Sequence, residues 1–425
     1  MAREDGLMKS RMRILILDTL IQTVDFTQPV RGGLVKAVWN DAIALSQKHD
    51  VFYAYYGKPT FDYKFHSVIL GDKGAKDWCL KHNKKTSLAH HKLKKDIPKY
   101  IDIISTIDPD VLIINVESKS QYLEAIAKKF IDIPKIFVFY DGVSNNDLFG
   151  TAGIIGTILK LKKYNSLITT ISEYTADSIT QVMIDREKDM RQYYDFMKEI
   201  PDVNTYQLFD VCSDHFVYYD NNAKLDIVDN AGFSVNIGRY QKKKGVLDLL
   251  NIHKFNNHIV KLYGVQDPVW DTGLEAYKKI KDAEEKYDNY EVCEAYSDEE
   301  LREDAKHGNN IVISCTVEGF GYTAFEMGVY GMPCVILKQG ERHATEEYLK
   351  KVGASYVVVD KKGNKNWKEE LYEAMLLTKL NRKEKKENAE KLLEYFTIEN
   401  YIQEREDFIE LAKQKLQNNK TKKLF

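Results

Sequence analysis

Short apolar segments alternate with longer amphipathic segments along the N-terminal half of the chain. The apolar segments are rich in Ile, Val, Leu and aromatic residues and are too short for helices, so they predict buried strands. These strands are expected at residues 13–18, 51–56, 111–115, 136–140 and 167–171. After the first strand, Leu34, Val38, Ala42 and Leu45 recur at helical spacing and predict a helix with one buried face. This alternation of strand and helix is typical of a parallel α/β sheet.

A second alternating set begins at residue 233 and repeats the same plan. Its strands are expected from residue 233 and at 259–263, 290–293, 311–314, 334–337 and 356–359. Two successive sets predict two Rossmann-like domains, at residues 1–228 and 229–396, joined through the polar stretch 220–224. A final helix and a short tail, residues 397–425, complete the expected organisation.

Composition agrees with this organisation and narrows the class of protein. A length of 425 residues fits two large domains, and 44% hydrophobic with 30% charged residues is typical of a globular protein. No run approaches the roughly 20 apolar residues of a membrane span, and a strand stands where a signal peptide would need a longer apolar core. Five cysteines lack any CxxC spacing, so we expect reduced thiols in a cytoplasmic protein: Cys79, Cys212, Cys293, Cys315 and Cys334.

One segment of the second half carries the densest set of candidate functional residues. A strand runs into a turn with Gly319 and Gly321, and the turn opens a helix that is predicted to end at Gly331. Such a turn offers backbone N–H groups and the positive end of a helix dipole to an anion. Glu318 and Glu326 add acceptors for the hydroxyls of a sugar. The combination indicates a nucleotide-sugar site; the alternative is an ordinary strand-to-helix junction whose glycines only ease packing.

A second glycine turn follows the strand that begins at residue 233. Gly238 and Arg239 lie in this turn, and Lys244 and Gly245 stand where the next helix is expected to begin. Arginine binds a phosphate as a planar fork and lysine binds it as a point charge. Because these cations lie beside a glycine turn and a helix start, phosphate binding is favoured over a merely solvated basic loop.

Together the two segments resemble the retaining glycosyltransferases of the GT-B fold, in particular those of family 4. In that family an E-G-F-G-x-x-x-x-E segment and an upstream G-R-x-x-x-x-K-G segment share the donor site. The resemblance implies an α/β protein whose two Rossmann-like domains face a central cleft. It also implies that the C-terminal helix, within residues 397–425, crosses back to the first domain.

The resemblance also assigns expected roles by position. Arg239 and Lys244 would hold the diphosphate of the donor, Glu318 would contact the transferred sugar, and Glu326 would bind the ribose hydroxyls. The other donor-binding positions implied are Gly33, Gly238, Gly319, Phe320, Gly321, Tyr322 and Thr323. Two further segments, residues 171–175 and 296–301, also match stretches of the family.

The expected chemistry needs neither a metal nor a cofactor, and a UDP-sugar is the expected donor substrate. Charge grows on the departing nucleoside diphosphate, and fixed cations and N–H groups lower the barrier by stabilising it. Arg239 and Lys244 supply those cations. A D-x-D spelling does occur at Asp108 and Asp110, but it directly precedes a buried strand and therefore predicts a helix-to-strand turn.

The chain departs from the family where the fourth strand of the first domain ends. Tyr140 stands where relatives often carry histidine, and Asp141 follows it. Tyrosine can hydrogen-bond a sugar hydroxyl but does not titrate near neutrality. Asp141 either orients the donor sugar or the acceptor hydroxyl as a catalytic residue, or it forms an Asx turn before Gly142. His343 is expected to be a surface histidine.

A basic stretch in the first domain points to the acceptor. Residues 64–99 hold ten lysines against three aspartates, with Lys92, Lys94 and Lys95 as the candidate acceptor-binding side chains. A basic surface suits a polyanionic acceptor: double-stranded DNA, an anionic envelope polymer or a phospholipid. The alternative is a solvated lysine-rich face.

A narrower similarity favours DNA. Residues 236–239 and 261–264 are similar to the corresponding region of the T-even phage DNA α-glucosyltransferases, which glucosylate hydroxymethylcytosine from UDP-glucose. It implies a hydroxymethylated base in phage DNA as acceptor, and the host cytoplasm as location. The oligomeric state is left open.

Three alternatives to DNA modification stay open at this stage. The first is an envelope or capsule glycosyltransferase, with residues 148–163 as either an interfacial helix or a buried helix with a basic end. The second, of a different class, is a non-catalytic nucleic-acid-binding protein that retains a decayed donor site. The third is a sugar-nucleotide epimerase, against which the E-G-F-G pattern favours transfer.

Overall fold

A computed structural model shows the chain as two compact α/β units. The first consists of Met1–Asp214 together with Tyr401–Phe425, and the second of His215–Asn400. The structure describes residues 11–19, 33–72, 94–116, 123–140, 148–212, 227–250, 258–264, 271–294, 296–315, 318, 320–340 and 342–422.

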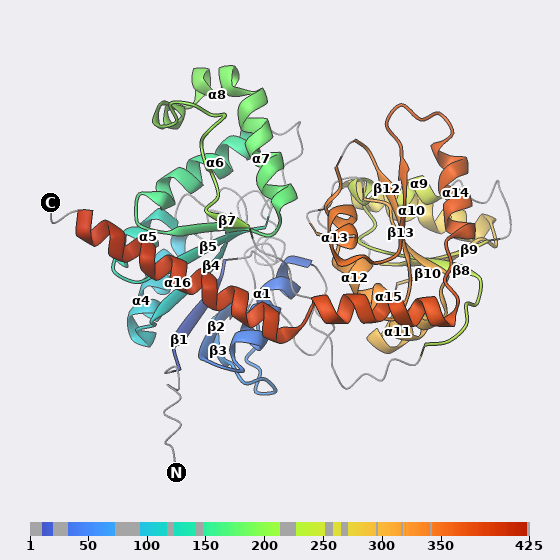
Figure 1. Ribbon diagram of the computed structural model, residues 1–425, viewed down its shortest axis with the longest axis horizontal. Helices are drawn as coiled ribbons and strands as arrows, with labels where there is room; N and C mark the ends of the chain where they lie inside the picture. The colour runs from blue at the N-terminus through green and yellow to red at the C-terminus, as the bar shows by residue number, and fades with distance from the viewer. Residues whose placement is uncertain are drawn as a thin grey trace, which may run out of the picture. The chain divides into compact units, whose positions relative to one another are not determined.

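The first unit is built on a parallel sheet of seven strands in the order β3-β2-β1-β4-β5-β6-β7 (Figure 1). The strands are β1 (Arg13–Asp18), β2 (Asp50–Tyr56), β3 (His66–Gly71), β4 (Val111–Val116), β5 (Lys135–Phe139), β6 (Leu167–Thr170) and β7 (Val211–Cys212). The helices are α1 (Gly33–Leu45), α4 (Ile97–Ile107), α5 (Glu124–Lys129), α6 (Leu148–Lys162), α7 (Glu173–Asp185), α8 (Glu187–Tyr193), the 3-10 helix η3 (Asp195–Glu199) and the C-terminal α16 (Ile398–Lys422). All strand pairs are parallel, although residues 57–65 join β2 to β3 without a helix.

One face of this sheet is covered by α4, α5, α6 and α7, and alternate strand residues meet them in a single core. Helix α6 packs into this core, where Ile155 and Ile158 are fully buried. Its basic end is paired: Lys162 lies 3.5 Å from Asp210. The apolar-then-basic segment is therefore a buried helix with a basic end, and its interfacial alternative is wrong.

Helix α16 follows the second unit in the chain but lies against α1 of the first unit (Figure 1). Arg405 donates to Asp41 Oδ1 at 2.8 Å, and the two side chains are only 4% and 1% exposed. Tyr401 also donates to Asp41 and accepts from Arg405 at 2.8 Å. Burial opposes the charge of Arg405, yet the Asp41 carboxylate raises the pKa of the guanidinium. We define Asp41, Tyr401 and Arg405 as the α16 clamp.

The second unit has a parallel sheet of six strands in the order β10-β9-β8-β11-β12-β13. The strands are β8 (Phe233–Ile237), β9 (Ile259–Tyr263), β10 (Tyr290–Cys293), β11 (Asn310–Ile313), β12 (Cys334–Lys338) and β13 (Tyr356–Asp360). The helices are the 3-10 helix η4 (Lys242–Lys244), α9 (Val246–Leu249), α10 (Asp271–Lys286), α11 (Asp298–His307), α12 (Tyr322–Gly328), α13 (Ala344–Val352), α14 (Trp367–Leu377) and α15 (Arg382–Tyr395).

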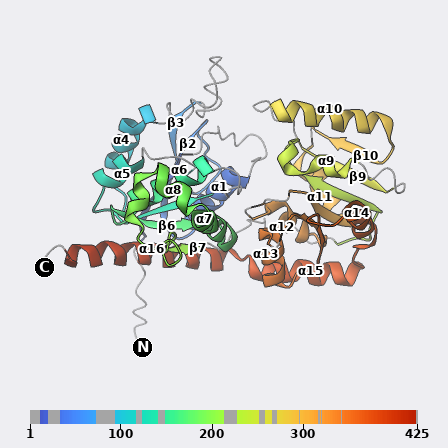
Figure 2. The ribbon, with the colours of Figure 1, turned by 90° about the horizontal axis from the view of Figure 1, so that it is seen from above.

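Helices cover both faces of the second sheet. Figure 2 shows α9 and α10 on one side and α12, α13 and α15 on the other. Adjacent residues of one strand therefore enter different cores: Ile311 packs with α12 and α15, whereas Val312 packs with α9, α10 and α14. Burial on both faces explains why the strands of this unit are continuous apolar runs in the sequence.

The predicted strands are present to within one residue at each end, and two further strands were missed. β3 was missed because it is a half-buried edge strand inside a basic stretch, and β7 because it has only two residues. The helix that was predicted to reach Gly331 ends earlier, at Gly328. The next turn tightens, with Gly331 N–H bonded to the Gly328 carbonyl at 2.8 Å, and Gly331 takes a positive φ of 90°.

The D-x-D spelling lies in a turn between α4 and β4, as predicted. Asp108 caps α4 in the left-handed region, and its carboxylate lies 3.2 Å from Arg13. Asp110 accepts the Arg13 backbone N–H at 2.7 Å. Both carboxylates thus bind Arg13, the first residue of β1.

Cys212, Cys293, Cys315 and Cys334 are all free thiols. Among the helices that the structure describes, none combines the length and the apolar character that crossing a membrane requires.

The α16 clamp yields a stability prediction. Arg405→Ala would leave the Asp41 carboxylate buried without its cation, so we expect the first unit to lose roughly 3–5 kcal/mol of unfolding free energy. Denaturant unfolding, followed by a probe in the first unit, measures this loss.

A matched control is the exposed pair of Arg186 and Asp189, 2.9 Å apart with side chains 47% and 44% exposed. Arg186→Ala should cost about 1 kcal/mol or less, as exposed ion pairs usually do. Equal losses in the two variants would show that the α16 clamp contributes no more than a surface pair.

Candidate functional site

The two glycine motifs follow neighbouring strands of the second sheet. β8 and β11 pair in the centre of the sheet, with register Asn310↔Ser234 and Ile311↔Val235. From this point the strand order runs outward in opposite directions, to β9 on one side and to β12 on the other. In sheets of this kind ligands bind at the carboxyl ends of the strands where the order reverses. Both motifs leave the sheet at that edge.

An ion pair joins the two motifs. Lys244 Nζ lies 2.9 Å from Glu318 Oε2, and the side chains are 29% and 24% exposed. Burial opposes both charges, but each group stabilises the other: Glu318 raises the pKa of Lys244, and Lys244 lowers the pKa of Glu318. Both groups are therefore charged throughout the neutral pH range. The structure thus brings together a candidate phosphate cation and a candidate sugar acceptor.

Backbone contacts hold the two loops beneath this pair. Ser314 Oγ donates to the Lys244 carbonyl at 2.9 Å. Asn236, a polar residue at the centre of β8, donates to Ser314 Oγ at 3.1 Å and to the Val312 carbonyl at 2.8 Å. The residue after β11 therefore holds the backbone of Lys244, independently of the ion pair that the Lys244 side chain makes.

Gly245 makes this close approach possible. Its φ is +71°, and a Cβ atom at this position would lie 1.8 Å from the Ser314 carbonyl oxygen. A side chain would therefore both strain the backbone and push the two loops apart. The K-G sequence of the motif thus has a packing reason as well as a charge.

A third anchor comes from the start of α13, which belongs to neither glycine motif. His343 Nε2–H donates to the Cys315 carbonyl at 2.8 Å, and Thr345 Oγ1 donates to the Phe320 carbonyl at 3.0 Å. Thr345 packs so closely on Gly321 that a Cβ there would lie 2.1 Å from Thr345 Oγ1. His343 is 0% exposed, so the expectation of a surface histidine is wrong.

The first turn of α12 contributes backbone groups and Glu326. Tyr322 and Thr323 are half-buried and begin the helix, where the first N–H groups have no intrahelical acceptor. Glu326 is half-buried one turn further along. Phe320, expected among the donor-binding positions, has its side chain in the core. Its ring stacks on Phe325 with centroids 4.6 Å apart and is 2% exposed, so it offers a ligand only its backbone.

Gly238 and Arg239 lie directly after β8. The Gly238 N–H is bonded to the Tyr263 carbonyl at 2.9 Å, which continues the pairing of β8 with β9. Arg239 is exposed. The positive charge of Arg239 repels that of Lys244 and acts to lower the pKa of the lysine. Helix α9 has only four residues, so its dipole is small, and the cations dominate this side of the site.

The candidate residues of the first unit are placed less completely. Gly33 is the first residue of α1. Tyr140 is buried and donates to Asn115 Oδ1 at 2.7 Å, so its hydroxyl already serves the end of β4. Lys94 and Lys95 are exposed just before α4. The remaining candidates Asp141, Gly319 and Lys92 lie outside the described residues.

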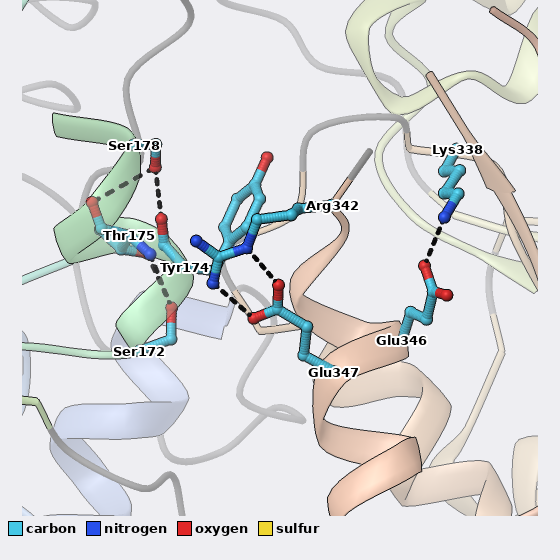
Figure 3. A network of polar contacts seen from close by, with 8 residues as sticks. All are labelled: Ser172, Tyr174, Thr175, Ser178, Lys338, Arg342, Glu346 and Glu347. Carbon is cyan, nitrogen blue, oxygen red and sulfur yellow. Dashed lines mark hydrogen bonds and ion pairs between the residues drawn. The ribbon is translucent and has the colours of Figure 1, made fainter. Parts of the chain in front are cut away.

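Figure 3 shows the local contacts at the starts of α7 and α13, each within its own unit. Ser172 caps α7 by accepting the Thr175 N–H at 3.1 Å. The start of α13 is neutralised by pairs: Lys338 lies 2.9 Å from Glu346, and Arg342 Nη2 lies 3.0 Å from Glu347. The two glutamates in the first turn of α13 are therefore paired with cations that precede the helix in the chain.

No metal-binding group is found in the described part of the chain. There, no three His, Cys, Asp or Glu side chains are grouped as a metal ion would require.

No protein-family model matches the chain, and no curated protein matches it.

Comparison with solved structures places the fold. A sucrose-phosphate synthase from Thermosynechococcus elongatus matches with a TM-score of 0.60 and 13% identity over 94% of this chain and 99% of that one. Anabaena HepE, in complex with UDP and glucose, matches with a TM-score of 0.61 and 12% identity over 94% and 100%. A trehalose-6-phosphate protein from E. coli, bound with UDP-2-fluoro glucose, matches with a TM-score of 0.59 and 10% identity over 95% and 99%. The chain therefore has the two-unit α/β fold of these GT-B proteins.

Gly245 provides a test of the loop contact. Gly245→Ala should cost roughly 3 kcal/mol of stability in the second unit, because a left-handed backbone penalty adds to displacement of Ser314. It should also abolish UDP binding measured by calorimetry, since Lys244 and the Glu318 loop would separate.

Gly353→Ala is the matched control, because Gly353 has a similar φ of +73° and no atom within 4 Å of the added Cβ. Only the backbone penalty of about 1–2 kcal/mol should appear there, with UDP binding retained. The loop contact would be unnecessary for binding if Gly245→Ala bound UDP as tightly as this control.

Proposed function

We propose that the protein is a glycosyltransferase that moves a hexose, with glucose the best candidate, from a UDP-sugar to a hydroxyl acceptor. The observation that carries this proposal is the pair of Lys244 and Glu318 at the central carboxyl edge of the second sheet. A cation for phosphate and a carboxylate for sugar hydroxyls stand side by side there. A nucleotide-sugar needs both groups at this spacing, because its diphosphate and its hexose are directly bonded to each other.

The side chains divide the chemistry between the leaving group and the sugar. Lys244 and Arg239 stabilise the negative charge that grows on the departing diphosphate, helped by N–H groups at the start of α12. Glu318 accepts hydrogen bonds from the transferred sugar, and Glu326 accepts them from the ribose. These cations supply the charge stabilisation that a metal supplies in other transferases, so we propose a metal-independent reaction.

Retention of the anomeric configuration is part of the proposal through the resemblance of the two motifs to family 4. The choice of UDP is supported by the two similar structures that contain UDP with glucose or UDP-2-fluoro glucose. An ADP-containing starch synthase from Arabidopsis thaliana also has this fold, with a TM-score of 0.59 and 13% identity over 95% of this chain and 99% of that one. The nucleotide is therefore an explicit variable in the test below.

For the acceptor we propose a hydroxymethylated base in double-stranded DNA. Its support is the basic composition of residues 64–99, of which Lys94 and Lys95 are exposed in the structure, and the similarity to phage DNA α-glucosyltransferases. The rival acceptor is an envelope glycan. Its support is the similar fold of WaaG, a glycosyltransferase involved in lipopolysaccharide biosynthesis. Burial of α6 removes the interfacial helix that favoured a membrane-bound acceptor. The charged pair of Lys244 and Glu318 argues against a decayed, non-catalytic site.

The proposal is tested by offering radiolabelled UDP-, GDP- and dTDP-sugars with hydroxymethylated DNA, plain DNA or membrane extract. Transfer from a UDP-sugar to hydroxymethylated DNA alone supports the full proposal. Transfer to the membrane extract alone would replace DNA by the envelope acceptor. No transfer and no hydrolysis of any donor would contradict the enzymatic proposal.

The donor roles predict the effects of single substitutions. Arg239→Ala and Lys244→Ala should each lower kcat by about 100-fold or more, because one fixed charge on the leaving group is removed. Glu326→Gln should raise the donor KM more than the acceptor KM. Steady-state kinetics with circular dichroism as a folding control measures these effects, and wild-type turnover in Arg239→Ala or Lys244→Ala would refute the diphosphate role.

The acceptor proposal predicts a change in salt dependence. Replacing Lys92, Lys94 and Lys95 by Gln together should raise the KM for DNA and reduce the slope of log affinity against log salt by about 3, near 0.9 for each phosphate that a lysine no longer neutralises. Filter binding at several salt concentrations measures the slope. Lys383→Gln, at an exposed lysine of α15 in the second unit, is the charge control, and an unchanged slope in the triple variant would rule out this lysine group as the DNA-binding surface.

A further inference from the structure

His343 belongs to neither glycine motif, yet it supports the loop that carries Glu318. Its ring is 0% exposed, and its Nε2–H donates to the Cys315 carbonyl at 2.8 Å. Cys315 lies three residues before Glu318. Thr345, two residues after His343, binds the Phe320 carbonyl on the other side of Glu318 at 3.0 Å. The start of α13 thus contacts Cys315 and Phe320, which stand on either side of Glu318 in the sequence.

The bond to Cys315 determines where the imidazole proton lies. A carbonyl oxygen can only accept, so Nε2 must carry the proton. In the neutral ring Nδ1 is then a bare acceptor, and this atom is buried without a hydrogen-bond partner among the described residues. The ring is therefore held by one directed bond, at the atom that faces the Glu318 loop.

His343 stands at the start of α13 but does not cap this helix. It is the N-cap residue of α13, where Ser, Thr, Asp or Asn usually bonds the helix's own N–H groups. His343 makes no such cap bond. Its donor instead crosses to the loop after β11. The side chain therefore serves the neighbouring loop and not the helix that it precedes.

Three charged groups act on the ring. Burial is the main influence and lowers the pKa of His343. The hydrogen bond to the Cys315 carbonyl raises this pKa, as do Glu318 and Glu346, and Lys338 lowers it. The ring is accordingly neutral at pH 7. A second proton would place a buried Nδ1–H where the described residues offer no acceptor, and would add a positive charge that attracts Glu318.

We propose that neutral His343 is a positioning residue of the donor site, which sets the place of Glu318 through the Cys315 carbonyl. This inference rests on the proposed glycosyltransferase function and adds a pH limit to it. Turnover requires the neutral ring, because protonation draws the Glu318 carboxylate away from its partnership with Lys244. Activity therefore falls on the acid side with a pKa below that of an ordinary histidine.

The test compares two substitutions at this position. His343→Ala removes the donor to Cys315, whereas His343→Gln places an amide N–H near the position of Nε2 and does not titrate. UDP binding is measured by calorimetry, and hydrolysis of UDP-glucose gives kcat and KM from pH 5 to 8. UDP binding reports the diphosphate contacts, and kcat reports the placement of Glu318.

For His343→Ala we expect kcat to fall roughly 10–100-fold while the Kd for UDP stays within threefold of wild type, since misplacing one group by about 1 Å costs this much. His343→Gln should recover at least tenfold of that loss and should lack the acid limb of the wild-type pH profile. A merely structural role would lower the amount of folded protein without moving the pH profile of the molecules that bind UDP.

Each other outcome is decisive. A kcat for His343→Ala within twofold of wild type overturns the inference. So does a folded His343→Gln that binds UDP but turns over no faster than the alanine variant. If the alanine variant fails to fold, the glutamine variant decides alone, and retention of the wild-type acid limb overturns the inference.

A control variant and the wild type separate this inference from the proposed function. Lys350→Gln, at an exposed position near the end of α13, should match wild type in every measurement. A wild type that neither binds UDP nor hydrolyses UDP-glucose would overturn the proposed UDP-sugar function, and this inference with it. A wild type that does both, beside an unaffected His343→Ala, would overturn only the role of His343.

Discussion

The candidate site depends on one ion pair, between Lys244 and Glu318, each of which stabilises the charge of the other in a half-buried place. The pair exists because two loops leave adjacent parallel strands at the same edge of a sheet. Gly245 allows those loops to touch, and Ser314 bonds across the contact. Partial burial strengthens the pair, while the remaining exposure leaves both groups open to a charged and hydroxylated ligand.

Further contacts within the second unit hold the described residues of this edge. Asn236 ties the centre of β8 to β11 from within the sheet, and Thr345 with His343 holds the outer side of the Glu318 loop. Phe320 anchors the same loop from below by packing into the core. Two of these contacts reach Cys315 and Phe320, which stand on either side of Glu318 in the sequence.

The first unit is completed by a segment that is remote in the sequence. Helix α16 returns after the second unit and is joined to α1 by Arg405 and Asp41, which are almost fully buried. A buried charge without its partner is costly, so this pair makes the C-terminal helix part of the first unit and not an independent tail. Tyr140 also makes a contact within this unit. Its hydroxyl donates to Asn115, although its position in the sequence suggested a ligand contact.

The sequence by itself indicated the strands of both sheets except β3 and β7, and the two glycine motifs with their candidate cations and carboxylates. Strand burial and positive-φ turns are local demands, so a run such as 334–337 or a residue such as Gly321 shows them directly. Tertiary structure alone decided that His343 is buried against the Glu318 loop, that Phe320 faces the core and that the helix after Gly321 stops at Gly328. These outcomes depend on which loops and helices meet in space. The periodicity of one segment shows which of its residues are buried but not which other segment packs on them.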